Sequence, residues 1–227
     1  MLIDLHSHST LSDGVRSIEE MVMAAERHGY RAFAVTDHVR YGDSAYRDVV
    51  PAVREEIERL RPQTAMQLFV GAEITDFPPS DIANIAHQVR RYGADVVVVH
   101  GECVSLDTAC GTNAQAVRCP EVDILGHPGL ITEEDAEAAA HHGIYLELSA
   151  IVGASYANGH VYEMARRTAA SIVVDSDAHD EAGLLTPRKV AGLVRGAGGS
   201  ELYLHQVRHR WAPALIDKLV RRYAMVS

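Results

Sequence analysis

Side chains that commonly bind metal ions recur along this sequence, each time at the end of a short apolar run. The first eight residues end in His6-Ser7-His8, and the run 172–174 precedes Asp175-Ser176-Asp177-Ala178-His179. Four further clusters occupy equivalent places, namely Thr36-Asp37-His38, Gly71-Ala72-Glu73, His100-Gly101-Glu102 and Gly126-His127-Pro128. Imidazole and carboxylate groups that come from the ends of successive strands are typical of one polynuclear metal centre.

The spacing within the clusters supports this interpretation. Residues two apart in a strand point to the same side, so His6 and His8 can bind one cation together, as can Asp177 and His179. Glu73 is the natural bridging group, because two carboxylate oxygens can hold two cations about 3.5–4 Å apart. A histidine taken singly is more often an ordinary hydrogen-bonded residue, but the shared position at strand ends favours ligands.

Hydrolysis of a phosphate ester is the chemistry expected of such a centre. If Asp13, Glu73 and Asp177 contribute −3 and three divalent ions +6, the site carries about +3. It would attract a phosphate dianion although the whole chain carries −10. A bound metal lowers the pKa of water from 15.7 towards about 7, which predicts a metal-bridged hydroxide as the nucleophile. Ligands without thiolate suit Zn²⁺, Mn²⁺ or Fe²⁺ and do not select among them.

Four other acidic residues lie in or near these clusters in the sequence. Asp13, in Ser12-Asp13-Gly14, fits either a metal ligand or a residue that stabilises a turn. Asp37, Glu102 and Asp175 are expected to orient ligand imidazoles or to contact the substrate.

Composition and charge narrow the class of protein. The 227 residues are 47% hydrophobic and 23% charged, as in a soluble globular enzyme, and we expect one domain over residues 1–227. The chain starts without the basic and apolar segments of a secretory signal, so we expect a cytoplasmic protein with no membrane association. Net charge −10 without a long basic run disfavours nucleic-acid binding. The basic residues near the end are expected to form a solvated helix face; they are Arg208, Arg210, Lys218, Arg221 and Arg222.

The elements that must position the clusters follow from the apolar pattern. Seven segments predict strands, near 2–5, 32–36, 68–72, 95–99, 122–125, 144–148 and 171–175. Helices are expected between them: one begins after Ser17, which forms a capping box with Glu20, and ends at Gly29. The others are expected at 48–60, 81–92, 133–142, 158–169, 188–195 and 212–224.

The distribution of ligands decides between two α/β architectures. Consecutive apolar residues at 96–99 indicate a strand buried on both faces, which suits either an open doubly wound sheet or a barrel. Six of the seven strands present metal-binding groups at their carboxyl ends, and only a closed ring lets so many converge. We therefore expect a seven-stranded (β/α)7 barrel of the TIM-like type.

The ordered set of clusters resembles one known family. His6-Ser7-His8, Ser12-Asp13-Gly14, Thr36-Asp37-His38, Glu73, His100, Gly126-His127-Pro128 and Asp177-Ala178-His179 are similar to the motifs of the PHP (polymerase and histidinol phosphatase) family of metal-dependent phosphoesterases. The resemblance covers residues 4 to 179. It implies a distorted seven-stranded β/α barrel, the PHP fold, with a site for two or three divalent metal ions.

Carried across position by position, the resemblance implies three groups of ligands. They are His6, His8, Glu73 and Asp177 for one metal, Glu73, His100 and His127 for a second, and Asp13, His38 and His179 for a third. Some relatives have histidine at the position of Asp13. Asp13, His38 and His179 are also our candidate catalytic residues, as groups that could assist the leaving oxygen.

Other motifs look most similar to the stand-alone, histidinol-phosphatase-like branch; they are His100-Gly101-Glu102, Gly111-Thr112-Asn113, residues 126–132 and Asn158-Gly159-His160. That branch leads us to expect a basic, phosphate-binding residue after the sixth strand, but residues 150–153 contain none. Arg40, Arg118 and Arg188 follow other strands and are candidates to contact the substrate instead. The departure leaves the hydrolytic centre intact and does not favour histidinol phosphate itself.

Three hypotheses for function remain open at this point. The first is a metal-dependent phosphomonoesterase that acts on a small phosphorylated molecule. The second is a phosphoesterase or nuclease that acts on a nucleotide or a nucleic-acid end, which the acidic charge disfavours. The third is a metal-binding regulatory module without turnover, because a fold does not guarantee an activity.

Overall fold

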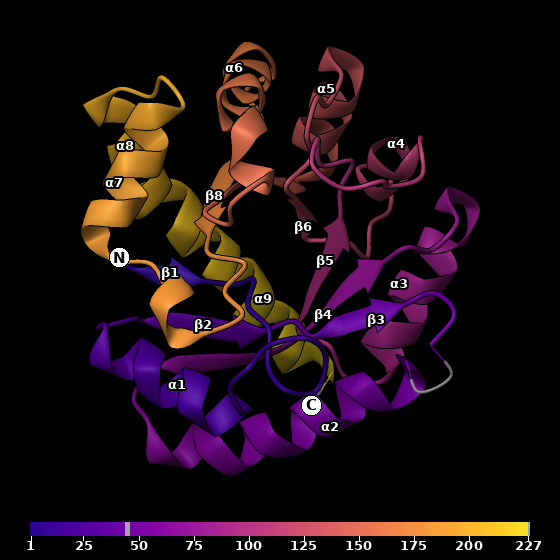
Figure 1. The fold of residues 1–227 in the computed structure, drawn as a ribbon, viewed down its shortest axis with the longest axis vertical. Helices are drawn as coiled ribbons and strands as arrows, with labels where there is room; N and C mark the ends of the chain where they lie inside the picture. Colours follow the sequence, from indigo (N-terminus) through magenta and orange to yellow (C-terminus); the bar gives the residue numbers. More distant parts are fainter. Residues whose placement is uncertain (44–45, 227) are drawn as a thin grey trace.

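Parallel strands form the centre of the computed structural model, which describes residues 1–43 and 46–226. The strands are β1 (Ile3–Asp4), β2 (Ala32–Val35), β3 (His38–Arg40), β4 (Gln67–Thr75), β5 (Val96–His100), β6 (Ile124–Gly126), β7 (Tyr145–Ser149) and β8 (Ile172–Asp175). Their order is β1-β2-β4-β5-β6-β7-β8 (Figure 1). The short β3 was not expected. It pairs with β4 beyond the end of β2, so β2 and β3 together occupy one position around the ring.

The ring closes between its first and last strands, beyond the ends of both. Ser7 and Ala178 form an isolated parallel bridge. The backbone N–H of His8 donates to the carbonyl oxygen of Ala178 at 2.9 Å, and the N–H of Asp177 donates to that of His6 at 2.9 Å. The nearly closed arrangement confirms the expected distorted (β/α)7 barrel. It also places the first and last ligand motifs of the sequence side by side.

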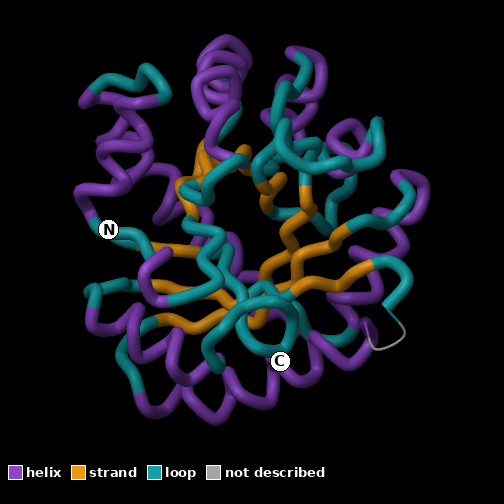
Figure 2. Tube along the Cα trace, in the orientation of Figure 1, coloured by secondary structure: helices purple, strands orange, loops and turns teal. Residues whose placement is uncertain are grey.

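Helices surround the strands, and loops connect the two layers (Figure 2). They are α1 (Ile18–Arg27), α2 (Tyr46–Leu60), α3 (Ile82–Arg91), α4 (Thr112–Ala116), α5 (Glu133–His142), α6 (Asn158–Thr168), α7 (Pro187–Gly196), α8 (Glu201–Gln206) and α9 (Ala212–Val226). The capping box of Ser17 and Glu20 is present. The sequence did not predict the short α4 and α8. None of the described helices is both long and apolar enough to span a bilayer.

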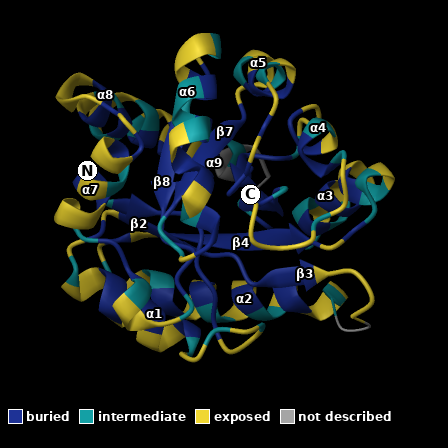
Figure 3. Cartoon of the chain, turned by 45° about the horizontal axis from the view of Figure 1, so that its top comes forward, coloured by how far each residue is buried: buried dark blue, intermediate teal, exposed yellow. Residues whose placement is uncertain are grey.

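The barrel is filled by side chains on the inner face of the strands. In β5, Val96 and Val98 belong to this inner cluster, whereas Val97 and Val99 pack outward against the helices. This alternation explains why positions 96–99 are all apolar. The strands of the barrel are buried beneath the helices (Figure 3). Helix α9 joins the inner cluster through Ala212, Leu215, Ile216 and Leu219, so the last helix covers the barrel interior.

A buried carboxylate also holds α9. The side chain of Asp123, just before β6, is fully buried and pairs with Arg90 of α3. From α9, Lys218 Nζ lies 3.1 Å and Arg222 Nη1 lies 2.9 Å from Asp123 Oδ1. The expectation that these two α9 residues form a purely solvated face was therefore wrong, because both pair with Asp123, which is distant from them in the sequence.

Candidate metal centre

The nine predicted metal ligands come together at the carboxyl ends of the strands. Four overlapping groups each have ligand atoms within 4.8 Å of one another: His6, His8 and Glu73; His6, His127 and Asp177; Glu73, His100 and His127; and His8, Asp13, His38 and His179. All but Asp13 and His179 are buried. The closed ring therefore produces the convergence that the sequence pattern required.

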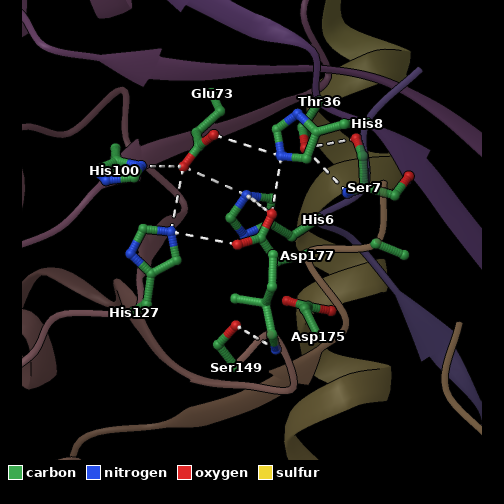
Figure 4. A network of polar contacts seen from close by, with 12 residues as sticks. His6, Ser7, His8, Thr36, Glu73, His100, His127, Ser149, Asp175 and Asp177 are labelled. Atoms are coloured by element: carbon green, nitrogen blue, oxygen red, sulfur yellow. Dashed lines mark hydrogen bonds and ion pairs between the residues drawn. The ribbon is translucent and has the colours of Figure 1, made fainter. Parts of the chain in front are cut away.

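Glu73, near the carboxyl end of β4, contacts several histidines of the cluster (Figure 4). Its Oε1 lies 3.0 Å from His100 Nδ1, 3.4 Å from His6 Nε2 and 3.4 Å from His127 Nε2. Its Oε2 lies 3.5 Å from His8 Nε2 and 2.7 Å from His38 Nδ1. The two oxygens thus face different sets of imidazoles, as a bridging carboxylate does.

Asp177 lies opposite Glu73 across the two N-terminal histidines (Figure 4). Its Oδ1 is 3.0 Å from His8 Nε2 and 3.6 Å from His6 Nε2, and its Oδ2 is 3.6 Å from His127 Nε2. His6 and His8 therefore face the same two carboxylates, as their spacing of two predicted.

A third group lies nearer the solvent. Asp13 Oδ1 is 3.2 Å from His179 Nε2, and Asp13 Oδ2 is 3.2 Å from His38 Nε2. His8 Nδ1 lies 3.9 Å from Asp13 Oδ1 and so connects this group with the buried ones. The side chains of Asp13 and His179 are 44% and 29% exposed, which makes this part of the cluster accessible from outside.

Several of these atoms lack an ordinary hydrogen-bond partner. Among the described residues, His6 Nε2, both ring nitrogens of His8 and His127 Nδ1 are buried without one. A buried polar atom left in this state costs free energy, and such atoms are rare in native proteins. Coordination of a divalent cation would satisfy the nitrogens that face Glu73 and Asp177. The residues present therefore fit a metal centre.

The imidazoles and carboxylates of the cluster shift one another's pKa values. Burial would raise the pKa of Glu73, but His38, His6 and His100 hold it well below its usual value. Burial likewise opposes ionisation of Asp177, yet His6 and His8 lower its pKa to about 2. The carboxylates are thus ionised at neutral pH, as cation binding requires.

Glu147, which the sequence pattern did not predict as a site residue, orients one candidate ligand histidine. It is fully buried in β7, the strand without a ligand at its end. The Nδ1–H of His6 donates to Glu147 Oε1 at 2.7 Å, which leaves Nε2 to face Glu73 and Asp177. A charged residue at an inward position of an apolar strand was the signal that could have identified it.

Glu147 also supports an unusual backbone conformation. His127 has a φ of 27°, in the left-handed region that costs non-glycine residues free energy. Its backbone N–H donates to Glu147 Oε2 at 2.8 Å. One carboxylate therefore holds two candidate ligands, His6 through its ring and His127 through its main chain.

The three acids that we expected to orient imidazoles or to contact the substrate hydrogen-bond to neighbouring segments in the structure. Asp37 accepts hydrogen bonds from the backbone and hydroxyl of Ser9 and from the hydroxyl of Ser12, in the loop that carries Asp13. Glu102 accepts from the backbone N–H groups of Gly111 and Asn113. Asp175 accepts a hydrogen bond from the backbone N–H of Leu5. Their hydrogen bonds thus go to backbone N–H groups and serine hydroxyls.

The three candidate arginines lie in different surroundings. Arg40 Nη2 is 3.9 Å from Asp13 Oδ2, at the exposed side of the cluster. Arg118 pairs instead with Asp135 and Glu134 of α5. Arg188 is exposed in the first turn of α7. Of the three, only Arg40 contacts a member of the cluster in the described structure.

Comparisons with known proteins bear on family and fold. The PHP domain family model matches residues 4–168. The uncharacterized protein MJ1295 of Methanocaldococcus jannaschii is 33% identical over 205 residues, which cover 89% of this chain and 93% of that protein. These matches show the family, since both extend over most of the chain.

Two solved structures share the fold at low sequence identity. A chain of an archaeal ribonuclease P complex with mature tRNA has a TM-score of 0.71 at 17% identity, covering 100% of this chain and 94% of that chain. Histidinol phosphate phosphatase from Lactococcus lactis, complexed with zinc, L-histidinol and phosphate, has a TM-score of 0.61 at 16% identity, covering 87% and 94%. The expected class of activity, a metal-dependent phosphoesterase, is confirmed together with the resemblance stated above. The chain belongs to the PHP domain family.

Proposed function

We propose that this chain hydrolyses the phosphate monoester of a small molecule and that its nine clustered side chains bind two or three divalent cations. The observation that carries the proposal is the position of Glu73, whose two oxygens face five imidazoles from four other strand ends. When bound there, divalent cations lower the pKa of coordinated water and neutralise phosphate oxygens. Zinc in the histidinol phosphate phosphatase structure supports this choice of cofactor.

The candidate ligands fall into a buried group and a more exposed group, and we assign them different roles. His6, His8, Glu73 and Asp177 are buried and hold their positions without access to bulk water. Asp13, His38 and His179 form the group that lies nearer the solvent. In this proposal they bind a third cation or handle the proton of the leaving oxygen. A ring nitrogen cannot do both at once, so occupancy of the third group decides the role of His179.

Arg40 is the residue that we assign to binding of the phosphate. Its guanidinium lies beside Asp13 and is 45% exposed, so it can reach a ligand at the cluster. A planar guanidinium suits phosphate because it donates two parallel hydrogen bonds. It would take the place of the basic residue that the loop 150–153 lacks.

Hydrolysis of p-nitrophenyl phosphate by the purified protein with Mn²⁺ or Zn²⁺ tests the proposal. We expect phosphate release that a chelator abolishes and that a His100→Ala, Asp177→Ala double variant loses. The matched control is the His87→Ala, Asp217→Ala double variant, in which the same residue types are removed from exposed helix positions. Equal rates for wild type and the His100, Asp177 variant would contradict the proposal.

A second candidate is action on a nucleotide or a nucleic-acid end. This candidate is supported by the fold match to a chain of a ribonuclease P complex with tRNA, which covers the whole length of this chain. Parallel assays on 5′- and 3′-phosphorylated oligonucleotides and on p-nitrophenyl phosphate would separate the two activities. Stoichiometric metal without turnover on either substrate would instead support a regulatory module.

A further inference from the structure

Large apolar side chains are exposed in the loops that follow β5, β6 and β7. They are Val104 (47% exposed), Leu106 (59%), Leu130 (67%), Val152 (85%) and Tyr156 (72%), and we call them the apolar loop patch. Two of them closely follow metal-centre histidines in the sequence, Val104 after His100 and Leu130 after His127. The patch therefore begins where the candidate metal centre ends.

Contacts between the three loops bring the segments that carry the patch together. A Cβ atom added to Gly129 would meet the carbonyl oxygen of Glu102 at 1.8 Å and the Cα of Cys103 at 3.2 Å. One added to Gly153 would meet the hydroxyl of Ser105 at 2.8 Å. The loops after β6 and β7 thus both pack directly on residues 102–105. Val104, Leu130 and Val152 are each neighbours in sequence of the residues that make these contacts.

The same loops offer nothing to attract a second anionic group. Residues 101–111, 128–132 and 150–157 contain no lysine or arginine, whereas Glu102 and Asp107 are acidic. A polyanionic ligand such as a nucleic-acid strand depends on cationic contacts to its phosphates. Contiguous exposed apolar surface is, by contrast, a common mark of a ligand-binding site. The side of the centre next to His100 and His127 is therefore suited to an uncharged, apolar group.

We propose that the apolar loop patch binds the alcohol part of the substrate, and that this alcohol is apolar and carries no second phosphate. The inference rests on the proposed phosphomonoesterase function and names its substrate class. A phosphate held at the metal ligands would bring its ester oxygen to the mouth of the barrel, and the loops after β5 to β7 start from that mouth. Burial of the alcohol against Val104, Leu130 and Val152 would then favour larger apolar esters.

Two aryl phosphates with phenols of similar acidity test this inference. Phenyl phosphate and 4-tert-butylphenyl phosphate differ in apolar size but little in the leaving group. With Mn²⁺ or Zn²⁺ added, we expect a kcat/KM about tenfold higher for the tert-butyl ester, the effect of burying about two methylene-sized groups. The Leu130→Ser, Val152→Ser double variant should bring the ratio of the two kcat/KM values close to one.

The Leu202→Ser, Val220→Ser double variant is the matched control, because it removes exposed residues of the same types from α8 and α9. It should keep the wild-type ratio. Equal kcat/KM for the two esters, or a higher value for a phosphorylated oligonucleotide, would overturn the inference while leaving hydrolysis established. Hydrolysis of neither ester would instead reject the proposed function. A wild-type dimer that the Leu130, Val152 variant converts to a monomer would assign the patch to contacts between copies, and this too would overturn the inference.

Discussion

At the scale of single residues, two carboxylates have distinct tasks. Glu73 faces the imidazoles with both oxygens, whereas Glu147 lies one layer deeper and fixes the ring of His6 and the backbone of His127. Partners of this second kind set the tautomer and orientation of a metal-binding histidine. Both roles can be separated from folding by measuring metal binding directly.

The substitution Glu147→Gln should weaken metal binding by about 10- to 100-fold, the usual effect of losing a carboxylate that orients a ligand histidine. Titration calorimetry with Zn²⁺ or Mn²⁺ measures this effect. Glu163→Gln, which makes the same change on the exposed surface of α6, is the control and should bind metal as wild type does. Unchanged affinity in the Glu147 variant would show that the hydrogen bond to His6 does not matter for binding.

Removal of Glu73 and removal of Asp13 should change the metal content differently. Glu73 is shared by two of the ligand groups that contain buried histidines, whereas Asp13 belongs to the exposed group alone. Elemental analysis of purified protein should therefore find a larger loss of bound metal in Glu73→Gln than in Asp13→Asn. Equal losses in the two variants would argue against a shared central carboxylate.

At the scale of elements, close approach of backbones sets the distance between ligands. A Cβ atom on Gly101, directly after β5, would meet the carbonyl oxygen of Gly126 at 2.4 Å and the Cα of Pro128 at 2.8 Å. The segments that carry His100 and His127 can therefore lie together only because residue 101 has no side chain. This requirement is imposed by packing between loops, since no positive φ is involved.

Gly101→Ala should force these two segments apart, destabilise the fold by about 1–3 kcal/mol and weaken metal binding. Gly192→Ala is the control and should stabilise the fold. A Cβ atom there meets nothing within 4 Å, and alanine has a higher helix propensity than glycine in the interior of α7. Chemical denaturation and metal titration of both variants check the prediction. A Gly101 variant with wild-type stability and affinity would show that the loops tolerate the added methyl group.

At the scale of the whole molecule, the last helix, α9, packs against the interior of the barrel. Helix α9 contributes apolar side chains to the barrel interior and two cations to the buried Asp123. Burial opposes ionisation of Asp123, but Arg90, Lys218 and Arg222 lower its pKa below the usual value of 3.8. This network joins α3 and α9 to the residue that precedes β6.

Asp123→Asn should destabilise the protein by about 2 kcal/mol at neutral pH, less than for a fully buried pair because the α9 cations are partly exposed. Because the folded pKa is depressed, the contribution of ionised Asp123 is present above the unfolded value near 3.8 and is lost as pH falls through the folded value. Urea unfolding at about pH 7 and about pH 3 should show wild type and variant converging in acid. A constant difference in unfolding free energy would contradict this assignment.

The sequence by itself predicted seven of the eight described strands, most of the helices, the nine candidate metal ligands and the family. These features are local: each ligand motif sits at a fixed offset from an apolar run, and alternation along a strand fixes which side chains share a side. The tertiary structure decided the roles of Glu147 and Asp123 and the packing of the three loops that carry the apolar loop patch. Each depends on which distant segments pack together, for example Glu147 with His6 or Gly153 with Ser105, and a linear pattern does not encode those partners. Closure of the ring, through backbone bonds between residues 6–8 and 177–178, is what turns the scattered motifs into one site.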